Sequence, residues 1–252
     1  MKTILIAFGL VLVAACVAKA QPNTACAVAQ HLATADFRLP HVAAAIAAKR
    51  LNISVIGSAS SSPSLAATSG ANKGYPARLE SLLGQKLPGV VVTVTTHAKA
   101  RETAANMETQ FIRVLAADKP ALVIWQTGTV EALRRSDVDD FRSVLEDGIG
   151  VLHHGNSDVI LMNMQYSPRT ELVTDPTQYA DAMRIVAMQQ EIPLFDRLAI
   201  MRHWGELGTF DFNEVTKTID TAAQVHDCIA RLLAHQIVEG ANLPNSVGNA
   251  IR

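Results

Sequence analysis

The sequence carries almost no net charge, and this lack excludes one large class of partners. Its 252 residues include 22 lysines and arginines and 23 aspartates and glutamates, a formal net charge of −1. Removing the first twenty residues would take away Lys2 and Lys19 and no acid, which leaves 20 basic residues against 23 acidic ones. Proteins that bind nucleic acid through its phosphates carry clusters of positive charge. No nucleic-acid partner is therefore expected.

Long hydrophobic runs are also lacking. The one at residues 4–17 is shorter than the roughly 20 residues that span a bilayer. A lysine precedes this run and Ala18-Lys19-Ala20 follows it, a pattern typical of a cleaved signal peptide at 1–20. The mature chain would then be secreted or periplasmic, without a transmembrane segment. A competing interpretation is that 13–16 resembles a bacterial lipoprotein box, which would make the protein a lipid-anchored envelope component at Cys16.

Cysteine is scarce, with three in the whole chain. Cleavage after Ala20 would leave Cys26 and Cys228. In an oxidising compartment such a pair favours a disulfide, and closing a loop of about 200 residues would stabilise the fold by about 4–5 kcal/mol in the chain-entropy model. Two separately buried thiols are the alternative.

Residues typical of metal or cofactor sites do not cluster in the sequence. His153 and His154 precede Gly155 at a predicted helix end, where imidazolium suits the helix dipole. No Asp, Glu or Cys stands at ligand spacing from them. The methionines are most simply core residues. No cofactor and no metal are expected.

Short apolar segments alternate with longer segments of helical spacing, which indicates one α/β domain with a mostly parallel five-stranded sheet covered on both faces. We expect an N-terminal extension at 21–51, the domain at 52–240 and a tail at 241–252, with no internal repeat. The predicted strands are 53–57, 90–94, 121–125, 158–163 and 193–195, and the predicted helices are 75–87, 102–117, 137–152, 177–190 and 222–239.

The segment 53–60, Ile-Ser-Val-Ile-Gly-Ser-Ala-Ser, is typical of a buried strand that runs into a small-residue turn. From about Asn52 to Leu233 the chain resembles the SGNH/GDSL hydrolases, in their secreted bacterial esterase-like branch. The other segments that carry the resemblance are 74–80, 121–129, 159–168, 192–195, 201–204 and 227–231. The resemblance implies a flavodoxin-like three-layer sandwich, the SGNH hydrolase fold, with strand order 2-1-3-4-5.

The family's catalytic positions hold unsuitable residues in this chain. The resemblance places the nucleophile at Ala59 and the glycine that helps to bind the oxyanion near Ala100. In the Gly-x-Asn turn, Gly128 and Thr129 are followed by Val130 in place of asparagine. The Asp-x-x-His block falls on Lys217 and Asp220, and no Asp-x-x-His string occurs anywhere in the sequence.

These replacements predict an impaired enzyme. Alanine has no hydroxyl to activate, and a carboxylate with a pKa of about 4 is a weak base at neutral pH. Losing one oxyanion donor typically costs about 2.7–4 kcal/mol of transition-state stabilisation. We therefore expect a pseudo-esterase that binds a carbohydrate, an acyl-ester molecule or a protein partner.

The opposing hypothesis is an active esterase or carbohydrate deacetylase with a displaced nucleophile. Ser58 or Ser60 would take that role, with His226 as the base and Asp220 beside it. Alternatively, the serines pair with turn backbone and His226 is structural.

A binding pocket is expected where the strands end. Gly57, Ser58, Gln126, Gly128 and Thr129 would line it, and the polar side chains among them, with that of Thr127, could bind a sugar or acetyl group or pair with loop backbone. Arg101 and Lys217 would favour anionic ligands if they face the pocket, although an ion pair between Lys217 and Asp220 is a simpler use of that charge.

Overall fold

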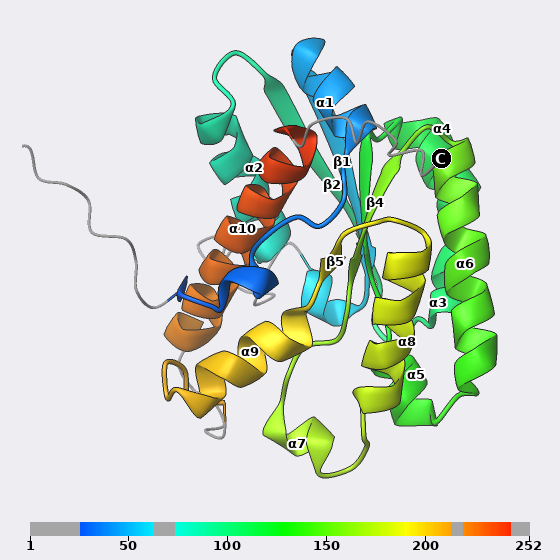
Figure 1. Ribbon diagram of the computed structural model, residues 1–252, viewed down its shortest axis with the longest axis vertical. Coiled ribbons are helices and arrows are strands. Elements are labelled where there is room, and N and C mark those ends of the chain that lie inside the picture. Colours follow the sequence, from blue (N-terminus) through cyan, green and yellow to red (C-terminus); the bar gives the residue numbers. More distant parts are fainter. Residues whose placement is uncertain (1–25, 63–73, 213–218, 243–252) are drawn as a thin grey trace, which may run out of the picture.

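The computed structural model describes residues 26–62, 74–212 and 219–242, and in it five parallel strands form one sheet between two layers of helices (Figure 1). The strand order is β2-β1-β3-β4-β5, with each neighbouring pair parallel. The strands are β1 (Arg50–Gly57), β2 (Val91–Ala98), β3 (Leu122–Gln126), β4 (Asp158–Met162) and β5 (Leu194–Phe195). The predicted fold class and strand order are thus confirmed.

Alternate side chains of the central strands point to opposite faces of the sheet and belong to two separate hydrophobic cores. Ile124 of β3 packs under the first helical layer, and its neighbour Trp125 under the second. The first layer contains α1 (Pro40–Ala47), α2 (Tyr75–Lys86), α9 (Arg197–Glu206) and α10 (Ile219–Asn242). The second contains α3 (Ala104–Glu108), α4 (Phe111–Asp118), α6 (Val138–His154) and α8 (Thr177–Gln189), with α5 (Thr129–Arg134) at its end. The short α7 (Pro168–Glu171) follows β4.

The predicted helix at 102–117 is two helices, α3 and α4. Around the break, the Thr109 hydroxyl donates to the Asn106 carbonyl and the Gln110 side chain to Glu102, so local side-chain bonds compete with a continuous helix. Helix α1, which the sequence did not predict, packs on β1 and α10. The segment placed in the N-terminal extension therefore covers one end of the sheet.

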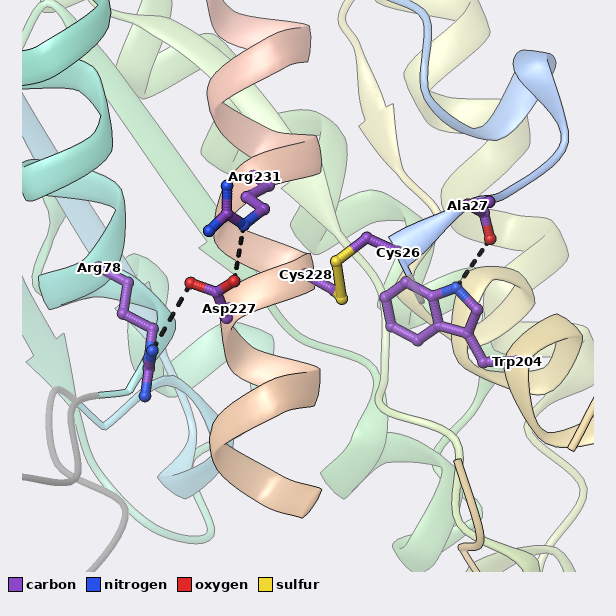
Figure 2. Close-up of a disulfide and its surroundings, with 7 residues drawn as sticks. All are labelled: Cys26, Ala27, Arg78, Trp204, Asp227, Cys228 and Arg231. Atoms are coloured by element: carbon purple, nitrogen blue, oxygen red, sulfur yellow. Dashed lines mark hydrogen bonds and ion pairs between the residues drawn. A yellow bond between two sulfur atoms is a disulfide. The ribbon is translucent and has the colours of Figure 1, made fainter. Parts of the chain in front are cut away.

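The first residues of the described chain are fastened to the last helix. A disulfide joins Cys26 to Cys228 of α10, the pairing expected from the sequence (Figure 2). Beside it, the Trp204 indole of α9 donates to the Ala27 carbonyl at 3.0 Å. One turn of α10 also presents Asp227, which bonds Arg231 at 2.6 Å and lies 3.6 Å from Arg78 of α2. None of the helices among the described residues is long and apolar enough to cross a membrane.

Gly148 of α6 packs directly against the Trp125 side chain of β3. A Cβ added there would stand 2.7 Å from the Trp125 ring and 3.1 Å from the Phe111 ring, and both rings are fully buried. Gly150, two residues on, has nothing within 4 Å of its added Cβ. We expect Gly148→Ala to lower the free energy of unfolding by about 1–3 kcal/mol through overpacking. The matched Gly150→Ala should raise it by about 0.5–1 kcal/mol, because alanine favours helix.

Urea unfolding of the two variants beside the wild type measures this difference. Equal stabilisation by both substitutions would show that the Trp125 ring yields without cost.

Candidate functional site

The turn after β1 is built around small residues. It continues as a single 3-10 turn at Ala59–Ser61, with the Ala59 methyl exposed and Ser61 buried. A Cβ on Gly57 would lie 2.7 Å from the Ser61 hydroxyl and 3.0 Å from Oε1 of Gln126. Only glycine fits, because the turn closes directly onto Gln126 at the end of β3.

Gln126 is the acceptor around which the serines gather. Its Oε1 lies 3.1 Å from the Ser58 amide and 2.9 Å from the Ser58 hydroxyl. The hydroxyls of Ser60 and Ser61 are each 3.1 Å from the same oxygen, and Ser61 is also 2.8 Å from the Tyr75 hydroxyl. An amide oxygen has two lone pairs, so the hydroxyl groups share this acceptor with the amide. Gln126 thus holds the turn together and has no free acceptor for a ligand.

His226 lies on the other side of Tyr75. Its Nδ1 accepts the backbone N–H of Tyr75 at 2.9 Å, and the two rings stack with centroids 6.0 Å apart. Burial, with further contributions from Arg197 and Arg78, lowers the pKa of His226 to about 3. The imidazole is therefore neutral at physiological pH, and its proton sits on Nε2. Toward the adjoining cavity His226 is a hydrogen-bond donor, not a general base.

The serines and this histidine do not form a nucleophile–base pair. Within the described chain, neither Ser58 nor Ser60 makes a hydrogen bond to a histidine; both bond Gln126. Tyr75 stands between, and burial raises the pKa of its phenol to about 12, so it too is no base at neutral pH. Lys217 and the Asp220 side chain lie outside the described residues.

Of the positions assigned to the oxyanion hole and its turn, Gly128 makes a structural contact. Gly128 has φ +94° and is the N-cap residue of α5, and its N–H donates to Glu131 at 3.1 Å. The other carboxylate oxygen of Glu131 accepts the Ala104 N–H, which ties α5 to α3. Thr129 and Val130 are half-buried, while Ala100 and Arg101 are exposed beyond β2. Arg101 lines a different surface hollow, with Lys99 and Glu102.

A cavity of about 320 Å³ opens beside the serine turn, between the loop after β4, helix α9 and the start of α10. Arg197, the first residue of α9, joins the two features, since its Nη1 is 3.5 Å from the Ser60 carbonyl. Among the described residues that line it, His226 is the one that the sequence predicted as a site residue. The lining residues are Gln165, Tyr166, Ser167, Arg169, Arg197, Met201, Asp211, Phe212, Thr221, Ala222, Val225 and His226.

The sequence does contain a signal for this cavity. Arg197 stands two residues after β5, and Gln165 three residues after β4, both at the carboxyl edge where open α/β sheets bind ligands. Applying that rule to every strand would have found them.

The family of this chain follows from comparison with other sequences. A model of the Non-GDSL lipase-like family matches residues 25–243. The chain belongs to this family. Its membership confirms the resemblance to SGNH/GDSL-like hydrolases seen in the motifs. Among proteins with curated descriptions, none matches this member of the Non-GDSL lipase-like family.

Solved structures share the fold of this Non-GDSL lipase-like protein. TesA is 19% identical with a TM-score of 0.55, covering 72% of this chain and 97% of TesA. A catalytic mutant of Axe2, an acetylxylan esterase from Geobacillus stearothermophilus, is 17% identical with a TM-score of 0.59, covering 73% and 93%. LAE5, an α/β-hydrolase enzyme from the metagenome of Lake Arreo, is 16% identical with a TM-score of 0.57, covering 74% and 95%.

Proposed function

We propose that this protein is a secreted, catalytically impaired member of its family, which binds a small carbohydrate or acyl-bearing molecule without cleaving it. The observation that carries this proposal is the engagement of Ser58 and Ser60 with Gln126 while His226 bonds the Tyr75 backbone. A serine attacks an ester only when an adjacent base takes its proton. Here the hydroxyls have an amide for a partner, and the histidine has its proton on the wrong nitrogen.

The ligand class rests on the fold and the cavity. A neighbour in fold is described as an acetylxylan esterase, and the cavity combines polar donors with apolar walls, as small-molecule sites do. We expect that the chain retains a binding site of this kind at the carboxyl edge of its sheet.

Labelling with a fluorophosphonate tests the loss of hydrolase chemistry. The mature protein, its Ser58→Ala and Ser60→Ala variants and a working serine esterase would be treated alike and read by intact mass and peptide mapping. We expect an adduct on the esterase alone. A stoichiometric adduct on Ser58 or Ser60 that disappears in the matching variant would establish the displaced nucleophile and refute the proposal.

Secretion is supported by the signal-peptide pattern at 1–20 and by the disulfide, because disulfides persist in oxidising compartments. The intact mass of protein expressed with its leader tests this part. A mass that begins at Gln21 would support cleavage and export. A mass that begins at a lipidated Cys16 would instead show an envelope lipoprotein.

A further inference from the structure

Arg197 is a buried cation. It is 1% exposed, and no carboxylate in the described part of the chain lies within ion-pair distance of it. The acid next to it in sequence, Asp196, faces the other way: it accepts from Asn163 at 2.7 Å and pairs with Arg184 at 2.8 Å. Buried charges are normally paired, because taking an ion out of water costs several kcal/mol.

The contacts of the guanidinium are few and neutral. One terminal nitrogen donates to Gln165 at 3.1 Å, the other reaches the Ser60 carbonyl at 3.5 Å, and Nε has no partner among the described residues. The Tyr75 ring lies under the guanidinium, 5.8 Å from its centroid. Burial lowers the pKa of Arg197 to about 10, so it remains charged at neutral pH. Of the five N–H donors of the guanidinium, two have partners in the part of the chain that the structure describes.

The cavity beside Arg197 has the other parts of an anion site. His226 offers Nε2–H, which no protein group among the described residues accepts, and Arg169 stands exposed at the rim. Asp211, the carboxylate in the lining, is engaged in an interaction of its own. The rest of the wall is mixed. Its apolar side chains are Met201, Phe212, Ala222 and Val225, and its polar ones are Gln165, Tyr166, Ser167 and Thr221.

The charge of the site selects the anion. His226 is neutral, so the described residues give the buried part of the cavity one positive charge, and a monoanion neutralises it. A carboxylate carries one negative charge at pH 7, whereas a phosphate monoester carries about 1.5 to 2 negative charges. The planar guanidinium also matches a carboxylate in geometry, and the apolar wall suits an attached hydrocarbon group.

We propose that this cavity binds an organic carboxylate, with the anionic group on Arg197 and His226 and a short apolar group against Met201, Phe212 and Val225. This inference rests on the proposed function, since it names the ligand class of the same site. Arg169 attracts the anion from the rim.

Calorimetric titration of the mature, disulfide-bonded protein tests the proposal. Acetate, butyrate and hexanoate would be compared with hexanamide, a neutral molecule of similar shape, and with inorganic phosphate and sulfate. We expect affinity to rise from acetate to hexanoate and hexanamide to bind at least about tenfold more weakly. Phosphate or sulfate binding more tightly than hexanoate, or hexanamide binding as well as hexanoate, would overturn it.

Variants separate a binding role of Arg197 from a structural one. Arg197→Met should weaken hexanoate binding at least about tenfold, while the melting temperature without ligand stays the same or rises, because an uncompensated buried charge is removed. Arg169→Gln should weaken binding about two- to fivefold, and Arg113→Gln, on the far side of the sheet, should leave it unchanged. A lower melting temperature of Arg197→Met with unchanged hexanoate affinity would refute the assignment.

Labelling the same protein samples with fluorophosphonate distinguishes failure of the carboxylate site from failure of the proposed function. A fluorophosphonate adduct would overturn the non-hydrolytic function and leave a carboxylate site standing as a product site. Failure to bind any carboxylate, with no adduct formed, would overturn this inference alone.

Discussion

Removing the disulfide, as Cys26→Ser with Cys228→Ala, should lower the free energy of unfolding by about 3–5 kcal/mol. The two cysteines are 202 residues apart, so the bond restricts nearly the whole unfolded chain, and the chain-entropy model gives about 5 kcal/mol for such a loop. Alanine suits position 228, because that side chain is 2% exposed within the first core. Position 26 is half-buried and accepts serine.

Urea unfolding of this double variant beside the wild type, with and without reductant, measures the effect. Reduced wild type should unfold at the same urea concentration as the variant, and reductant should leave the variant unchanged. The Trp204 indole bonds the Ala27 carbonyl next to the disulfide, whereas the other tryptophan, Trp125, is fully buried under the second helical layer. A change in tryptophan fluorescence before global unfolding would therefore indicate that the N-terminal segment detaches first. If the oxidised wild type and the variant were equally stable, the disulfide would not stabilise the protein by restricting its unfolded chain.

The sheet could be predicted because its strands have a local signal. Ile53, Val55 and Ile56 in β1, and Val123 to Trp125 in β3, are apolar residues that a two-sided buried strand requires. The strand order came from the family resemblance. Helices α1 and α9 were not predicted, since α1 has only eight residues and both lie beside segments assigned to loops or an extension.

The site could be predicted only in outline. The sequence placed Ser58 and Gln126 in one pocket, and it brought His226 to them only in the hypothesis of a displaced nucleophile. In the structure all three lie around Tyr75 and the turn after β1. It could not show which atoms meet. Contacts between residues 65 or more apart, such as Ser61 with Gln126 or Arg197 with Ser60, depend on side-chain positions in the folded core. The same holds for Arg197, whose charge has no counterion among the described residues.

The second large effect is expected in acid. The folded-state pKa of His226 is about 3, against 6.5 ordinarily, so between these values the unfolded chain binds a proton that the folded chain does not. His226 therefore lowers stability as pH falls below 6.5, by up to about 4 kcal/mol at pH 3. Asp158 acts in the opposite direction. Burial raises its pKa to about 6 although it accepts the Val42 N–H at 2.8 Å, so its contribution to stability increases as pH falls through 6.

His226→Asn separates the two contributions. Asparagine can still accept the Tyr75 N–H but does not titrate. At pH 7 we expect the variant to be less stable than the wild type by about 1–2 kcal/mol, because a buried ring is lost. At pH 4 the order should reverse, since the wild type bears about 3 kcal/mol of proton-linked destabilisation that the variant lacks.

Urea unfolding at pH 7, 5.5 and 4, for the wild type, His226→Asn, Asp158→Asn and the double variant, measures both groups. The change in free energy of unfolding caused by His226→Asn should reverse its sign between pH 7 and pH 4. It should do so both in the wild type and in Asp158→Asn, because the two sites lie at opposite edges of the sheet and should act additively. If the free energies of unfolding of the wild type and His226→Asn instead changed in parallel with pH, His226 would be protonated in the folded protein near pH 6. In that case Nδ1 could not be the acceptor of the Tyr75 N–H, and the imidazole would be available as an acid or base toward the cavity.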